Sequence, residues 1–123
     1  MSAMNNERNP TIVPYVLGTQ GSAIIRPFIF VSRKFRISAV RIVDAAGIAL
    51  DAVNFVTVRV RRGSVTVAEY ATATDGAVVA DVSRAFRILD PVIPGDTHLN
   101  IQVVIGGTGT TTNAFLQVEG FFV

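Results

Sequence analysis

Short runs in which apolar and polar residues alternate dominate the sequence, and this is the pattern of a β-strand with one buried face. Residues 54–70 (NFVTVRVRRGSVTVAEY) contain two such runs joined at Gly63. In the first run Val56, Val58 and Val60 share one face. Because a glycine between two alternating runs readily forms a tight turn, these residues predict a β-hairpin.

Further strands are expected along the chain, separated by glycine and proline turns, and no helical heptad or long internal repeat occurs. About eight short strands with turn signals every 8–12 residues are typical of an all-β antiparallel sandwich or barrel. Pro14 suits only an edge strand or a bulge, because it has no N–H to donate. Besides the hairpin, strands are expected at residues 11–17, 22–31, 36–44, 98–105 and 114–123.

Two segments between these strands are less clearly patterned. The apolar residues of AVVADVSRAFRILD (77–90) recur at helical spacing, but the abundance of valine suits two short strands equally well. We favour a strand at 85–89 and leave the rest of 75–89 open between helix and strand. Residues 45–53 are expected to form a loop, and one helical turn within it is left open.

The composition is unusually apolar for a soluble domain. Of 123 residues, 50% are hydrophobic and 16% are charged, whereas roughly a quarter are charged in a typical chain. No apolar run reaches the roughly 20 residues of a membrane-spanning helix, and residues 1–10 lack the apolar core of a signal peptide. We therefore predict one domain that buries a second surface against other protein chains. We expect no contact with a membrane.

Several strands are apolar on both faces, which predicts that a neighbouring subunit covers one of them. In the last strand Leu116, Val118 and Phe122 share one face, while Phe115, Gln117, Glu119 and Phe121 share the other. Arginines at the rim of such an interface are expected to pair with carboxylates such as Glu69 or Glu119 of the same or an adjacent chain. The residues predicted for the oligomer interface are Phe55, Arg59, Arg61, Phe115, Phe121 and Phe122.

The first eleven residues are polar, include three asparagines and precede the first apolar run, so we predict a flexible N-terminal arm at 1–11 and a single sandwich domain at 12–123. Such an arm lets a small protein contact a larger surface. The residues expected to make that contact are Asn5, Asn6, Glu7, Arg8, Asn9 and Pro10.

Candidate catalytic chemistry is sparse. The chain has no cysteine and one histidine, His98, whereas a metal site needs several converging ligands. Most of the six aspartates fall near expected turns, where their side chains cap backbone N–H groups. The glycines of GGTGTTTN (106–113) are followed by no lysine or helix, unlike a phosphate-binding loop. We predict a protein that is not an enzyme and has no catalytic, metal or cofactor site.

The stretch VIPGDTHLNIQVVIGGTGTTTNAFLQVEGFFV (92–123) joins a Pro-Gly-Asp turn, an alternating strand, a Gly/Thr-rich loop and a final apolar strand. In this stretch, and in its run of short Val/Ile/Thr strands, the chain resembles the jelly-roll capsid decoration or cement proteins of tailed bacteriophages. The resemblance implies a jelly-roll-like sandwich that forms a homotrimer on the exterior of the virion capsid. The protein would be assembled into the virion in the host cytoplasm. On the capsid it would bind the major capsid protein and bridge its subunits without catalysis.

Two other functions remain open. One is a carbohydrate- or receptor-binding module of a head fibre or tail, with exposed Tyr15 and Tyr70 as its aromatic contacts. The other is a nucleic-acid-binding sandwich that uses Arg59, Arg61 and Arg62, with binding that weakens steeply as salt rises. The net charge of +2, with nine carboxylates interspersed among eleven cations, favours no direct contact with nucleic acid.

Overall fold

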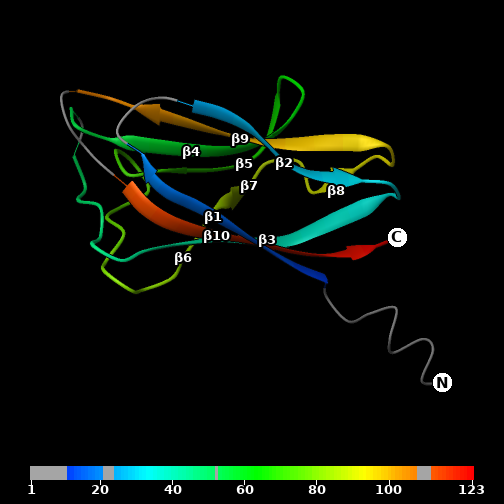
Figure 1. Ribbon diagram of the computed structural model, residues 1–123, viewed down its shortest axis with the longest axis horizontal. Helices are drawn as coiled ribbons and strands as arrows, with labels where there is room; N and C mark the ends of the chain where they lie inside the picture. The colour runs from blue at the N-terminus through cyan, green and yellow to red at the C-terminus, as the bar shows by residue number, and fades with distance from the viewer. Residues whose placement is uncertain (1–10, 21–23, 52, 108–111) are drawn as a thin grey trace.

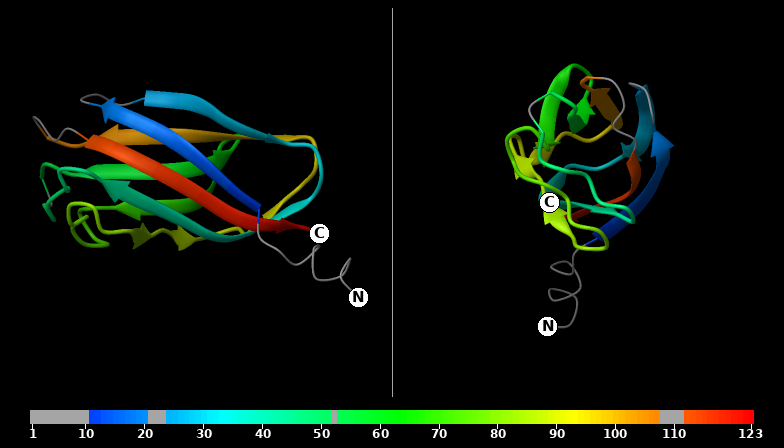
Figure 2. Two further views of the ribbon diagram at one scale, coloured as in Figure 1. Left: turned by 60° about the horizontal axis from the view of Figure 1, so that its bottom comes forward. Right: turned by 90° about the vertical axis from the view of Figure 1, so that its left-hand side faces the viewer.

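Within the part of the chain that the computed structural model describes, residues 11–20, 24–51, 53–107 and 112–123, ten strands form two antiparallel sheets (Figure 1). The sheets pack face to face, which confirms the predicted all-β sandwich (Figure 2). The first sheet contains β1 (Thr11–Gln20), β10 (Thr112–Phe122), β3 (Phe35–Asp44), β6 (Arg84–Ala85) and β8 (Val92–Ile93). The second sheet contains β2 (Ile24–Val31), β9 (Thr97–Ile105), β4 (Val56–Arg62), β5 (Val65–Ala71) and β7 (Arg87–Ile88).

The strands pair as a long hairpin that has been rolled up. β1 pairs with β10, β2 with β9, β3 with β6 and β8, and β4 with β5, so the pairs are nested from the ends of the chain inward. Rolling places β10 beside β3 and β9 beside β4, which completes the two sheets. This is the jelly-roll arrangement, so the predicted jelly-roll-like fold is confirmed.

The core lies between the sheets and is built from the predicted alternation. On β4, Val58 and Val60 stand opposite Val103 and Ile101 of β9, and all four are almost fully buried. Leu116, with other residues of the first sheet, covers them from the opposite layer. Each such side chain contributes about 1.5–3 kcal/mol of hydrophobic stabilisation relative to exposure.

The segment that the sequence left open crosses from one sheet to the other. β6 pairs with β3 in the first sheet and β7 pairs with β5 in the second, so the strand expected at 85–89 is present but divided. The dividing residue, Phe86, is buried and donates its backbone N–H to the carbonyl of Val40 (2.8 Å). The described residues of 75–89 contain no helix, because the burial of Phe86 and the two separate pairings require extended backbone.

The loop after β3 is held against the segment after β5 by a two-way bridge between Ile48 and Val78. No helical turn occurs in its described residues, in agreement with the loop expected at 45–53.

Among all described residues, no helix is long and apolar enough to cross a membrane.

Both prolines within long strands lie at sheet edges. Pro14 is on β1 and Pro27 is on β2, and each of these strands pairs on one side only. Each edge strand also carries a register shift, between Val16 and Gly18 on β1 and between Pro27 and Ile29 on β2. A missing donor and a bulge both hinder the addition of another strand. Contacts with other molecules are therefore expected at the faces and ends of the sandwich.

Candidate functional site

The outer face of the second sheet is occupied by ion pairs within the chain. Glu69 on β5 accepts hydrogen bonds from Arg59 on β4 and Arg87 on β7, each 2.6 Å long. Arg59 also donates to Gln102 on β9 (3.3 Å), and Arg87 also pairs with Asp75 (2.9 Å). Burial acts to raise the pKa of the Glu69 carboxyl, but the hydrogen bonds from the two arginines outweigh it and hold the pKa below its ordinary value.

The three arginines singled out in the sequence, Arg59, Arg61 and Arg62, have different surroundings. Arg59 pairs with Glu69 of the same chain, which is one of the two pairings expected. Arg62 pairs with Asp90 (2.8 Å), and Arg61 is half-buried. Glu69 neutralises Arg59 on this face, and Asp90 neutralises Arg62, which lies at an inward-facing position of β4 in register with buried Leu99, so these arginines are a poor match for nucleic acid.

Phe55 lies at the end of β4, where its ring packs against the backbone of Gly106. A side chain at position 106 would overlap this ring, and the Gly106 N–H donates to the Phe55 carbonyl (2.8 Å). Phe55 is therefore half-buried in contacts that hold two strand ends together.

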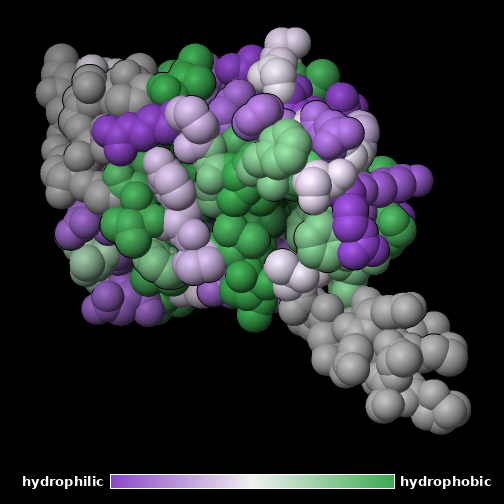
Figure 3. Space-filling view, turned by 45° about the vertical axis from the view of Figure 1, so that its right-hand side comes forward, coloured by the Kyte–Doolittle hydropathy of each residue, from purple (hydrophilic) through white to green (hydrophobic). Residues whose placement is uncertain are grey.

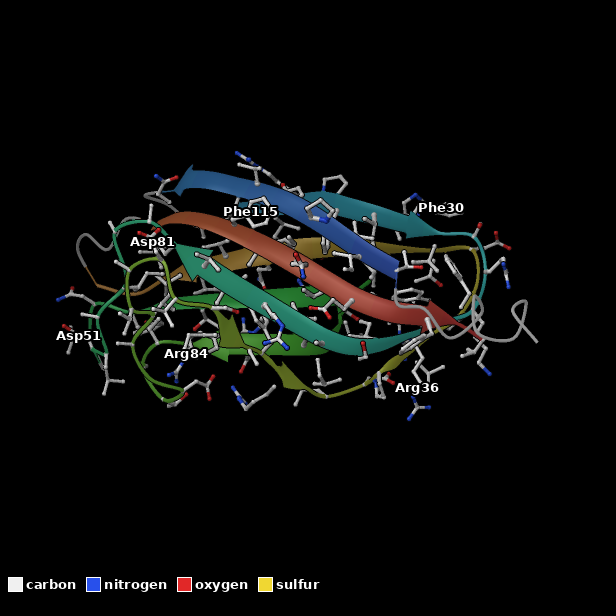
Figure 4. All side chains as sticks on the ribbon, turned by 90° about the horizontal axis from the view of Figure 1, so that it is seen from below. Phe30, Arg36, Asp51, Asp81, Arg84 and Phe115 are labelled. Atoms are coloured by element: carbon white, nitrogen blue, oxygen red, sulfur yellow. The ribbon has the colours of Figure 1, made fainter. Side chains whose placement is uncertain are left out.

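The outer face of the first sheet is different, because exposed apolar side chains there stand in register with one another, whereas exposed Ile25 and Phe30 on the second sheet are in register with Gln102 and His98. Val16 on β1 is 69% exposed, and it is in register with Phe115 on β10, which is 41% exposed. Phe115 is in turn in register with half-buried Val43 on β3. Figure 4 looks onto this face and labels Phe115. We call these three side chains the apolar row; Ile12, 53% exposed, lies further along β1 on the same face.

One ion pair lies beside the apolar row. Arg41 Nε is 3.2 Å from Glu119 Oε2, and the Gln117 amide donates to the same oxygen (3.1 Å). A hollow of about 240 Å³ separates this pair from the row. Its lining residues are Arg41, Val43, Ser83, Phe115 and Gln117. The hollow thus offers an aromatic wall next to hydrogen-bonding groups.

The last aromatic residues lie where β10 ends. Phe121 is half-buried on the outer face, in register with Arg36 of β3. Phe122 shares the inner face with Leu116 and Val118, as predicted, and its ring packs edge-on against buried Phe35 (centroids 5.2 Å apart). Phe122 is nevertheless 39% exposed, because it lies at the end of the sandwich rather than within it.

The six residues predicted for one interface therefore do not form one surface. The sandwich core separates those on the second sheet from those on the first. The sequence also missed part of the apolar row, although the run Ile12-Val13-Pro14-Tyr15-Val16 is apolar on both faces of its strand. The second sheet carries Phe55, Arg59 and Arg61, and the first carries Phe115, Phe121 and Phe122.

The residues predicted for the arm contact, Asn5 to Pro10, lie outside the described residues. β1 begins at Thr11, the last residue of the predicted arm. Thr11 lies at the end of the sandwich that also carries Phe122.

The histidine and the buried aspartate singled out in the sequence make contacts within the fold. The His98 ring packs on Phe30 (centroids 4.7 Å apart), and the described residues contain no group of three His, Asp or Glu side chains that could hold a metal ion. Buried Asp44 accepts backbone N–H groups from Ala46, Gly47 and Asn113, which confirms turn capping at this aspartate.

Tyr70 was expected to be exposed, and this was wrong. The side chain is 3% exposed, and its hydroxyl donates to the Gly76 carbonyl (2.7 Å) and accepts from Arg84 Nε (3.1 Å). A tyrosine buries its ring readily when its hydroxyl finds such partners. Tyr70 is thus unavailable for stacking on a ligand.

No protein-family model and no curated protein matches the sequence. Two solved structures are similar in shape. One, described as the crystal structure of the infectious bursal disease virus VP2 subviral particle, has a TM-score of 0.45 and 12% identity over 94% of this chain. The other, the structure of the infectious bursal disease virus Gx strain, has a TM-score of 0.39 and 12% identity over 92% of this chain. This chain spans 33% and 32% of those two chains.

Proposed function

We propose that this chain is a non-enzymatic structural protein of a virion. It would act as a jelly-roll decoration protein that forms a homotrimer through the outer face of its first sheet and binds the major capsid protein on the capsid exterior. Its task would be mechanical: bridging neighbouring shell subunits without a cofactor, a membrane or direct contact with nucleic acid.

The contrast between the two outer faces carries this proposal. Across the second sheet, Arg59, Glu69 and Arg87 satisfy one another within the chain. On the first sheet Val16 and Phe115 stand side by side and exposed to water. An uncovered apolar face rimmed by polar groups is typical of a protein–protein contact.

The strength of that contact can be estimated from exposure. Ile12, Val16 and Phe115 are 53%, 69% and 41% exposed. Covering these fractions would contribute roughly 2–5 kcal/mol per subunit. Association itself costs about 4–15 kcal/mol, so the three side chains alone support only weak binding. We therefore expect self-association that depends on protein concentration and is strengthened on a shell, where neighbouring copies are held close together.

Analytical ultracentrifugation of the full chain over a range of concentrations tests the self-association. The wild type is expected to form trimers as concentration rises, and Val16→Asp is expected to stay monomeric. Ile25→Asp is a matched control, since Ile25 is 61% exposed on the other edge strand and faces outward from the second sheet. A wild type that stays monomeric at the highest concentration, or equal effects of both variants, would refute this interface.

Shell binding is tested separately by co-sedimentation with capsids that lack decoration. The arm at residues 1–11 is proposed to contribute to this contact, so deleting residues 1–10 should weaken co-sedimentation while leaving the trimer intact. Unchanged co-sedimentation would exclude the arm from the contact.

A receptor- or carbohydrate-binding module is the second candidate, and the hollow beside Phe115 favours it. An aromatic ring next to Arg41, Gln117 and Ser83 is suited to a sugar, which stacks its apolar face and hydrogen-bonds through its hydroxyls. A glycan array tests this function directly. Binding that is lost in Phe115→Ala would support a glycan site, and an array without any signal would leave the structural role alone.

A further inference from the structure

An apolar pocket opens at the end of the sandwich where β1 begins and β2 ends. We call this the β2–β3 end, because the loop at 32–34 joins those strands there. The pocket lies between the two edge strands and has a volume of about 140 Å³. Figure 3 brings this end forward and shows hydrophobic side chains gathered in a band across the displayed face. The lining residues are Thr11, Val13, Ile29, Phe30, Val31, Ser32, Phe35 and Phe122.

The size of the pocket limits its occupant. An apolar protein cavity of about 150 Å³ holds one benzene molecule. A pocket of about 140 Å³ with aromatic and branched walls therefore accommodates one phenyl ring or one branched aliphatic side chain. Transferring such a side chain from water into the pocket favours binding by about tenfold to a hundredfold.

The rim of the pocket is positively charged. Arg33 and Lys34 are exposed in the loop after β2, and Arg36 is exposed near the start of β3. The Arg33 guanidinium lies 5.0 Å from the centre of the Phe122 ring, so a cation lies directly against the pocket wall. Figure 4 shows Arg36 at the same end, with its side chain pointing away from the sheet.

These cations differ from four other arginines of the described residues. Arg41, Arg59, Arg62 and Arg87 each pair with a carboxylate, whereas none of the three rim cations has an ion pair within the described ranges. The described side-chain carboxylate that is exposed and unpaired at this end is Asp96, in the turn before β9. The carboxylate of Val123, whose N–H donates to the Lys34 carbonyl, is a second negative charge there, so three cations against two carboxylates leave an excess of positive charge complementary to an acidic partner.

We propose that the β2–β3 end binds an acidic segment of another protein, which inserts one phenylalanine or leucine side chain into the pocket while flanking carboxylates meet Arg33, Lys34 and Arg36. Because Pro14 and Pro27 hinder strand addition at both edges, the segment is held by this side chain and its charges. The proposal deepens the structural role and rests on it for the source of the segment, a subunit of the shell.

The test uses fluorescence anisotropy of a labelled peptide, Asp-Glu-Phe-Asp-Glu, with the full wild-type chain. We expect saturable binding with a Kd below about 1 mM that weakens as salt rises. Replacing the central residue of the peptide by alanine should weaken binding at least about tenfold. The peptide Lys-Lys-Phe-Lys-Lys should not bind.

Variants of the chain locate the site. The double variant Arg33→Ala/Lys34→Ala is expected to lose about threefold in affinity per charge, and Phe122→Ala should remove most of the preference for the aromatic peptide. Arg26→Ala is the matched control, because Arg26 is exposed on β2 outside the pocket lining. No saturable binding, or equal losses in Arg26→Ala and the double variant, would overturn the proposal.

Two further measurements distinguish an external partner from other occupants of the pocket, and the pocket proposal from the trimer proposal. Tighter peptide binding after deletion of residues 1–10 would show that the chain's own arm fills the pocket, which would overturn an external partner. Tighter peptide binding in Val16→Asp would identify a second copy as the occupant, and loss of binding in Val16→Asp would mean that the site forms only in the trimer; either result would overturn the proposal. Unchanged binding in Val16→Asp supports the proposal. Binding by a wild type that never self-associates would refute the trimer interface alone.

Discussion

Replacing Glu69 by glutamine keeps the size of the side chain and removes its charge. In the folded protein this carboxylate receives hydrogen bonds from Arg59 and Arg87, each 2.6 Å long. A glutamine retains one acceptor, but its amide group would face an arginine donor instead of accepting from it. One guanidinium would therefore lose its hydrogen bond to residue 69, although Arg59 keeps Gln102 and Arg87 keeps Asp75 as partners.

The expected loss follows from the burial of the three groups. The Glu69 side chain is 18% exposed, Arg59 is 33% exposed and Arg87 is 48% exposed. Exposed ion pairs contribute about 0.2–1 kcal/mol, and hydrogen bonds to charged groups contribute about 1.5–3 kcal/mol when well shielded. Because this cluster lies between the two cases, Glu69→Gln should lower the free energy of unfolding by about 1–3 kcal/mol. For a domain of this size the melting temperature should fall by about 4 °C per kcal/mol.

The pH dependence gives a sharper check. The pKa of Glu69 is lowered in the folded state from its ordinary value of 4.5, so the unfolded chain binds the proton more readily. The stabilisation is therefore complete above pH 4.5 and is lost as the pH falls through the lower, folded-state pKa. Chemical denaturation across this range should show the wild type and Glu69→Gln converging in stability as the medium becomes acidic.

Glu119→Gln is the matched control on the first sheet. Glu119 pairs with Arg41 at 3.2 Å, and that arginine is 47% exposed, so the expected loss is below about 1 kcal/mol. The reasoning is refuted if Glu69→Gln costs no more than Glu119→Gln, or if the gap between wild type and Glu69→Gln stays constant from neutral to acidic pH.

Three other substitutions test local features by thermal or chemical denaturation. Asp44→Asn should cost about 2–4 kcal/mol, because the buried carboxylate accepts three backbone N–H groups; faster amide exchange at Gly47 and Asn113 would confirm the cause, and unchanged exchange would contradict it. Tyr70→Phe should cost about 1–2 kcal/mol by removing the hydroxyl that bonds the Gly76 carbonyl, and a neutral effect would show that bond to be dispensable. Gly120→Ala should cost about 3 kcal/mol, since the added carbon would overlap the Arg36 carbonyl and the Phe35 ring; wild-type stability would mean that β10 shifts freely.

Local alternation was enough to predict the strand pattern. The valines at 56, 58 and 60 face the core, as their spacing indicated, and Gly63 forms the hairpin turn with a φ of 59°. The even and odd residues of β10 also divide between the inner and outer faces as predicted. These features depend on the two-residue repeat of a strand, which is fully contained in a short stretch of sequence.

The division of 84–88 between two sheets could not be predicted in the same way. Alternation reports which residues share a face, but it does not say which sheet a strand joins. The contact of Phe86 with the core and its hydrogen bond to Val40 depend on a residue far away in the sequence. Strand membership is therefore settled by long-range pairing.

By itself the sequence determined the class of fold, the hairpin, the edge position of Pro14 and an excess of apolar surface. Only the tertiary structure decided on which outer face the charged side chains pair within the chain. Glu69 meets Arg59 and Arg87 because β4, β5 and β7 are neighbours in one sheet, while Val16 and Phe115 meet because the two ends of the chain pair in the other. The physical reason is that the chemistry of a sheet face is set by residues side by side across strands, and sequence order does not specify those neighbours.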